Sequence, residues 1–252
     1  MKLLVTNDDG VNAKGIYALI KELEKHHEVL VVAPDDQRSA SSHSITLTRP
    51  LKVKEVLLEG IKAKAYSVDG TPADCVRIAL DQLVEGGVDL VVSGINRGFN
   101  LGADILYSGT VSAAIEAAIY KVPSIAVSMD VTDNIEDYEI AAKYGAKVVQ
   151  IAKEQKIDSD LVLNVNVPLL KEEAIKGIKV CKIGSIVYNN YFEESLLGQE
   201  KGQRTFDIKG RINKDHKDET DTRFINEGYV TLTPLHYDLT NFKILTDVSK
   251  WF

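Results

Sequence analysis

The chain has 252 residues, of which 44% are hydrophobic and 27% are charged. This composition excludes a disordered or collagen-like protein, and the length suffices for one α/β domain with a sizeable core, or for one domain with a smaller appendage. The net charge of -7, from 30 basic and 37 acidic residues, argues against a broad basic surface that binds a nucleic-acid scaffold through many phosphates.

Cysteine usage and hydropathy both favour the cytoplasm. Cys75 and Cys181 lie far apart and form no CxxC pair, which predicts inert core thiols and argues against a disulfide framework or a zinc site. The chain does not open with a basic segment followed by an apolar one, and no apolar run approaches the roughly 18 residues of a membrane span. We therefore expect a cytoplasmic protein with no membrane contact.

The first ten residues predict a buried strand that ends in two carboxylates. The apolar run of residues 3–5 stops at Asp8, Asp9 and Gly10. Adjacent like charges repel and are costly to desolvate unless a cation lies between them. A solvated Asp-Asp-Gly turn explains the same residues, so this segment alone leaves a turn and a cation site equally open.

The next elements predict a right-handed parallel crossover. Residues 15–24 have helical spacing of apolar positions, and residues 28–34 form a second buried strand that proline stops. The polar, serine-rich segment 35–44 follows at the carboxyl end of that strand, where α/β folds place ligand contacts. A solvated loop is the alternative. His43 in this segment could contact phosphate, but a loop residue with no catalytic role is the favoured interpretation.

A hairpin-like insertion over 45–55 and 63–68 precedes a strong helix start. Thr71 is the expected N-cap, Pro72 the first helical residue and Asp74 the acid of the first turn. The buried strand 88–93 then delivers the glycine-rich loop 94–104, which contains Asn96, to the sheet edge that also holds Asp8.

Residues 107–118 predict a loop that runs into a helix of small residues. The free N–H groups at such a helix start can bind an anion, although Ser108 and Thr110 are equally explained as helix caps. The strand 124–129, the helix 138–152 and the strand 161–168 complete the pattern. The fold class is therefore α/β, with a Rossmann-like, doubly wound, mostly parallel sheet over residues 1–170.

The strand-helix alternation stops at about Lys171. Residues 186–192 and 205–208 predict the two arms of a hairpin joined by 193–203, and residues 228–234 predict a late strand. We expect residues 171–252 to form a smaller, β-rich oligomerisation region that returns to the core, with a solvated charged loop over 215–221. The hairpin aromatics Tyr188, Tyr191 and Phe192 could stack on a nucleobase, but burial against a partner is the favoured interpretation.

Three segments thus bring oxygen ligands to one sheet edge, and the set is Asp8, Asp9, Ser39 and Asn96. Carboxylate, hydroxyl and amide oxygens are hard ligands, which suit one Mg²⁺, Mn²⁺ or Ca²⁺ better than zinc. A divalent cation beside a helix-start anion site suits phosphate ester hydrolysis, with Asp8 or Asp9 able to accept a proton.

Three other protein classes fit the sequence less well. A receiver domain would have a phosphorylatable aspartate where Ser93 and Gly94 stand. A haloacid-dehalogenase-type phosphatase needs Asp-x-Asp, but Gly10 lies two positions after Asp8. A dinucleotide-binding oxidoreductase would have G-x-G-x-x-G after the first strand, and this chain does not.

At these residues the sequence resembles the SurE survival proteins, the metal-dependent 5'/3'-nucleotidases. The resemblance is carried by LLVTNDDG, VAPDDQRSASSHSIT, VDGTPADCVRIAL, SGINRGFNLGADILYSGTVSAAIEAA and GYVTLTPLHYDLT. The family's common Ser-Gly is Ser39-Ala40 here, which keeps the serine ligand. The segment 193–203 matches nothing, so its role stays open.

The resemblance implies a divalent-metal site of Asp8, Asp9, Ser39 and Asn96, with Asn96, Ser108, Gly109 and Thr110 near the substrate phosphate. The implied substrates are nucleoside 5'- and 3'-monophosphates, with short polyphosphate as a further candidate. It also implies a homo-oligomer, a dimer or a tetramer, that exchanges carboxyl-terminal segments. The preferred nucleotide, the physiological cation and the carboxylate that acts as base are left open.

Overall fold

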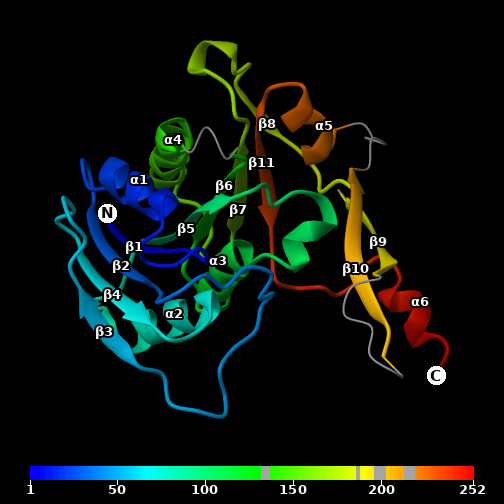
Figure 1. Cartoon of the computed structure of the whole chain (residues 1–252), viewed down its shortest axis with the longest axis horizontal. Helices are drawn as coiled ribbons and strands as arrows, with labels where there is room; N and C mark the ends of the chain where they lie inside the picture. The colour runs from blue at the N-terminus through cyan, green and yellow to red at the C-terminus, as the bar shows by residue number, and fades with distance from the viewer. Residues whose placement is uncertain (132–136, 186–187, 196–202, 213–218) are drawn as a thin grey trace.

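The computed structural model describes residues 1–131, 137–185, 188–195, 203–212 and 219–252 (Figure 1). Within these ranges a nine-stranded sheet has the order β3-β4-β2-β1-β5-β6-β7-β11-β8. The strands are β1 (Lys2–Thr6), β2 (Glu28–Pro34), β3 (Val53–Val56), β4 (Lys64–Val68), β5 (Leu90–Arg97), β6 (Ser124–Met129), β7 (Val162–Val167), β8 (Ile178–Val180) and β11 (Val230–Leu235).

The helices are α1 (Lys14–Leu23), α2 (Pro72–Ile78), α3 (Gly109–Ile119), α4 (Glu139–Gln155), α5 (Asp221–Asn226) and α6 (Leu245–Ser249). Of these, α1 and α4 pack on one face of the sheet, and α2 and α3 pack on the other (Figure 1). Shorter turns are the π-helical η1 (Ala79–Leu83) and the 3-10 turns η2 (Gly102–Leu106) and η3 (Glu172–Ala174). The predicted α/β class and doubly wound topology are confirmed.

Strand pairing places the functional loops at a topological switch point. Strands β4, β2, β1, β5, β6 and β7 run parallel to one another, while β3 pairs antiparallel with β4 as the predicted hairpin-like insertion. The chain winds outward from β1 through β2 to β4, and then returns to the other side of β1 with β5. Ligands bind where the winding direction reverses in this way, which here is the carboxyl end of β1 and β5.

Alternate residues of each buried strand belong to opposite layers of the core. Leu3 and Val5 pack with α1 and α4, whereas Leu4 packs with α2 and α3. Four alanines of α3 are fully buried, namely Ala113, Ala114, Ala117 and Ala118. Their small size lets α3 lie close to the sheet, as expected from packing alone.

The carboxyl-terminal residues return to the main sheet, as expected. Strand β11 pairs antiparallel with β7, and β8 pairs parallel with β11. A separate antiparallel pair, β9 (Tyr188–Ser195) and β10 (Thr205–Ile212), forms the predicted hairpin. No helix in the described parts of the chain is both long and apolar enough to cross a membrane.

Two boundaries in this region were predicted wrongly. Residues 193–195 belong to β9, because they pair with residues 205–207 of β10, so they are not part of the joining loop. Asp221 is fully buried at the first position of α5, whereas we expected it in a solvated loop. Of the rest of that predicted loop, residues 215–218 lie outside the described residues.

We expect Leu19→Ala to lower the free energy of unfolding by about 2–5 kcal/mol, because Leu19 is fully buried between α1 and the sheet. Leu57→Ala is the matched control, since Leu57 is 98% exposed, and it should change stability by less than about 0.5 kcal/mol. Urea denaturation measures both variants. Equal changes in the free energy of unfolding for the two variants would contradict the packing of α1 on the sheet.

Candidate metal and phosphate site

A buried asparagine shapes the turn that follows β1. Asn7 donates from Nδ2 to the Gly10 carbonyl at 2.9 Å, and its Oδ1 accepts from the Gly10 N–H at 3.2 Å. Gly10 has φ +98°, and a Cβ there would lie 3.3 Å from the Asp36 backbone, so glycine suits this position. The turn therefore presents Asp8 and Asp9 at the carboxyl end of β1 in a fixed arrangement.

Asp8 lies against the first turn of α3. Its side chain is buried, and Oδ1 accepts a hydrogen bond from the Thr110 hydroxyl. A Cβ on Gly109 would lie 2.8 Å from Asp8 Cβ and 2.9 Å from both Asp8 Oδ2 and the Ser41 hydroxyl. The missing side chain at Gly109 thus lets Asp8 and Ser41 approach the helix start together.

Burial raises the pKa of Asp8 from its usual 3.8 to about 6. The hydrogen bond from Thr110 opposes this rise in the pKa, while the neighbouring charge of Asp9 adds to it. The ionised form of this carboxylate is therefore costly in the protein alone. A cation beside it would remove that cost.

Gln37 and Arg97 connect the remaining predicted cation ligands, which are Asp9, Ser39 and Asn96. Asp9 accepts from the Arg97 N–H at 3.0 Å and from Gln37 Nε2 at 3.4 Å. The same Gln37 nitrogen donates to Ser39 Oγ at 2.8 Å. Asn96 precedes Arg97 and donates from Nδ2 to the Gly98 carbonyl at 2.8 Å, which leaves Oδ1 as the atom of this side chain able to bind a cation.

Ser108 has a structural role at this helix start. It is the N-cap of α3, and its hydroxyl accepts from the Val111 N–H at 3.1 Å. Gly109 and Thr110 are the first two helical residues, and the N–H groups of a first helical turn carry partial positive charge. The predicted phosphate site is therefore located at a true helix N-terminus, with the Ser108 hydroxyl engaged as a cap.

The residues present fit one hard divalent cation. Among the described residues, no group of three or more His, Cys, Asp or Glu side chains could hold a metal ion. Two carboxylates, a serine hydroxyl and an amide oxygen leave positions for water, which suits Mg²⁺ or Mn²⁺ and not zinc. The Ser41 hydroxyl is buried, lies like Asp8 against Gly109, and has no hydrogen-bond partner among the residues that the structure describes, so it is available for a further polar contact.

Several residues that build the site were not found from the sequence. Ser41 could not be distinguished within a run of serines, and Gln37 has no spacing that marks it as a bridge. A buried network also holds the glycine-rich loop: Asn100 donates to Ser128, its N–H binds Asn166, and its carbonyl accepts from Asn164 and Asn166. The two asparagines at alternate positions of the apolar strand β7 were the available signal, because a buried amide needs partners.

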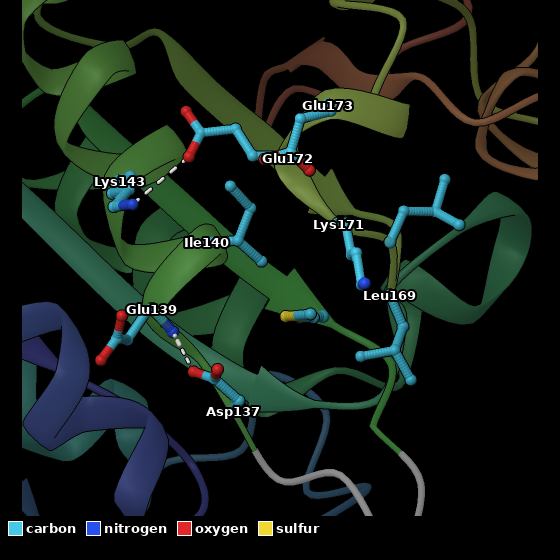
Figure 2. Close-up of a pocket in the computed structure, with 10 residues that line it drawn as sticks. Asp137, Glu139, Ile140, Lys143, Leu169, Lys171, Glu172 and Glu173 are labelled. Atoms are coloured by element: carbon cyan, nitrogen blue, oxygen red, sulfur yellow. Dashed lines mark hydrogen bonds and ion pairs between the residues drawn. The ribbon is translucent and has the colours of Figure 1, made fainter.

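A different cavity, of about 480 Å³, opens beside α4 near the carboxyl ends of β6 and β7. Figure 2 shows its lining, in which Lys143 pairs with Glu172 at 3.3 Å and Asp137 accepts from the Glu139 N–H at 2.9 Å. Its charges are thus partly paired with one another. None of the predicted site residues is among the described residues that line it, so it does not compete with the Asp8 site.

The raised pKa of Asp8 predicts a pH dependence of stability in the metal-free protein. The folded protein holds the Asp8 proton up to about pH 6, whereas the unfolded chain releases it near pH 3.8, so stability falls as pH rises through this window. The shift corresponds to about 3 kcal/mol. Asp8→Asn should abolish this contribution, as measured by urea denaturation in EDTA at pH 4 and pH 7.5. An identical pH dependence in both proteins would contradict the assignment.

The chain matches known proteins over most of its length. The family model described as "Survival protein SurE" matches residues 3–190. The 5'-nucleotidase SurE of Clostridium tetani is 52% identical over 252 residues, with 100% of both chains covered, and that of Clostridium beijerinckii is 55% identical, with 100% of this chain and 99% of the relative covered. A crystal structure of the SurE protein from Aquifex aeolicus matches with TM-score 0.88 and 40% identity, over 100% of this chain and 99% of the other. The chain therefore belongs to the SurE family.

Proposed function

We propose that this protein is a divalent-metal-dependent phosphomonoesterase that hydrolyses nucleoside 5'-monophosphates. One observation carries the proposal, which is that the buried carboxylate of Asp8 lies against Gly109 and Thr110 at the start of α3. A cation site and an anion site thereby share one corner. The names of the Clostridium relatives, 5'-nucleotidase SurE, support the same activity.

In this proposal Asp8, Asp9, Ser39 and Asn96 hold one Mg²⁺ or Mn²⁺. The cation supplies charge neutralisation at a phosphoryl oxygen and makes bound water more acidic. The N–H groups of Gly109 and Thr110 orient the phosphate, together with Asn96. Ser108 contributes by capping the helix, which keeps these N–H groups aligned.

The carboxylates differ in their suitability for moving a proton. Asp9 accepts hydrogen bonds from Arg97 and Gln37, and these fix its orientation. Asp8 combines burial with a pKa raised to about 6 in the protein without a cation, and a bound cation would lower that pKa, so either carboxylate remains a candidate for accepting the proton. Nucleoside 3'-monophosphates and short polyphosphate are further candidate substrates, because the site binds the phosphate end and leaves the rest of the ligand outside.

We also propose a cytoplasmic homo-oligomer, a dimer or tetramer, in which residues 171–252 exchange segments around the catalytic core of residues 1–170. Support comes from exposed apolar side chains in this region. Phe192 and Ile208 are paired across the hairpin, and they are 71% and 69% exposed. Trp251 and Phe252 are exposed at the carboxyl terminus. A second copy of the chain would bury such area.

A substrate panel with Mg²⁺, Mn²⁺ or EDTA tests the activity. We expect hydrolysis of nucleoside monophosphates with either cation, and a loss of at least about 100-fold in kcat for Asp8→Asn and Asp9→Asn, since each removes a charge from the cation site. Asp81→Asn is the control, because Asp81 is exposed on η1, and it should keep full activity. Turnover that persists in EDTA would overturn the proposal.

The oligomer is tested by light scattering after size exclusion. The pair Phe192→Glu and Ile208→Lys replaces an apolar cross-strand pair by an ionic one, which keeps the hairpin compatible with its own pairing. We expect a shift towards the monomer mass. Leu57→Glu, at a site that is 98% exposed and outside this region, should leave the mass of the assembly unchanged. An unchanged mass in the hairpin variant would count against a hairpin interface.

A further inference from the structure

The serine loop, residues 38–44, is tied to α3 by a histidine that the proposed chemistry does not use. His43 Nε2 lies 2.6 Å from Glu116 Oε2, and Glu116 is buried on the third turn of α3. The other oxygen of Glu116 lies 3.8 Å from Nε of Arg77 on α2. A buried carboxylate needs donors, so the short contact to His43 satisfies Glu116 and holds the loop at the same time.

The loop needs such a tie, because its backbone is intrinsically unfavourable. Ala40 and Ser42 have φ of 52° and 50°, in the left-handed region that is unfavourable for residues with a side chain. The contacts that offset this cost lie on both sides of Ser41. Arg38 N–H donates to the Asp8 carbonyl at 2.7 Å, and Ser42 N–H donates to the Tyr107 carbonyl at 3.1 Å.

These contacts join the loop to the helix that forms the phosphate site. Tyr107 immediately precedes the N-cap of α3, and Glu116 lies two turns further along the same helix. Ser39, the proposed cation ligand, and Ser41, whose hydroxyl lies beside Asp8, are located between the anchors at Arg38 and at Ser42 and His43. The position of both serines relative to Asp8 therefore depends on how the loop is fixed to α3.

We propose that His43 is a positioning residue, which through its bond to Glu116 holds Ser39 and Ser41 in register with Asp8. The inference rests on the proposed function, because the cation and phosphate are what the serines would bind. Loss of an ordinary stabilising contact would lower global stability and leave the cation affinity unchanged. Loss of a positioning contact would instead lower the cation affinity of a protein that remains folded.

The test compares five variants with the full-length wild type. His43→Ala removes the tie, and His43→Gln places an amide N–H near the position of Nε2. Glu116→Leu removes the acceptor, alone and combined with His43→Ala, and His26→Ala removes an exposed histidine just before β2. Three quantities are measured: hydrogen exchange of peptides covering residues 38–46 without metal, the Kd for Mn²⁺ by calorimetry, and kcat and KM for a nucleoside monophosphate.

We expect His43→Ala to exchange its loop amides at least about tenfold faster, and to bind Mn²⁺ about 10- to 100-fold more weakly, as is typical when a residue that orients a ligand is lost. The kcat for the nucleoside monophosphate should fall together with the Mn²⁺ affinity. His43→Gln should recover most of the affinity, and His26→Ala should stay within about threefold of wild type. Glu116→Leu, which removes the acceptor at similar volume, should reproduce His43→Ala, and the double variant should be no worse than either single variant.

Unchanged loop exchange or unchanged Mn²⁺ affinity in His43→Ala would overturn the proposal, and so would an equal loss in His26→Ala. Failure of the proposed function looks different. In that case the wild type itself would neither bind Mn²⁺ nor hydrolyse the nucleotide, while the exchange comparison would still report whether His43 holds the loop.

Discussion

The burial of Asp8 against the start of α3 is the constraint on which the rest of the site depends. It requires a residue without a side chain at Gly109, because a Cβ there would collide with the carboxylate. It requires Thr110 as a donor, and it gives the carboxyl group a pKa near 6 that a bare protein surface would not. The same contact brings the negative side chain to the positive end of the helix, so that a cation and a phosphate can bind side by side.

The scaffold supplies rigidity and the loops supply ligands. Parallel strands end at one edge, and the small residues of α3 let that helix pack closely on the sheet, so the helix start is fixed relative to β1. Loops are less constrained by themselves, and here each is tied down by buried polar groups. Asn100 is held by residues of β6 and β7, and the serine loop is held through the Asp8 carbonyl, the Tyr107 carbonyl and Glu116.

Local rules were sufficient for most of the fold. The helix start at Thr71 and Pro72, the proline stop after β2 and the apolar runs of the central strands were predicted correctly, because capping and burial leave short-range signatures. Asp221 was assigned wrongly since a charged residue in a charged stretch looks solvated. Its burial depends on N–H donors from Gly102 and Gly184, which are 119 and 37 residues away in sequence.

The same contrast between short-range signals and long-range contacts applies to the site. Asp8 and Asp9 follow β1, and Asn96 lies near the carboxyl end of β5, so topology alone predicts that they share an edge, and the structure places them there. Their roles as ligands stay predictions. The bridge from Gln37 to Ser39 and the bond from His43 to Glu116 depend on loop conformations with left-handed residues other than glycine, and no periodicity encodes these.

Asp221 also links the first 170 residues to the carboxyl-terminal region. Its two oxygens accept from Gly102, in the loop before α3, from Gly184, at the approach to the hairpin, and from Thr222. The sequence pattern changes near residue 170, but a fragment that ended there would leave the Gly102 N–H without its acceptor and would expose the edge of β7 that β11 covers. A fragment of the first 170 residues would therefore keep every proposed ligand and lose the contacts that Asp221 and β11 make with it.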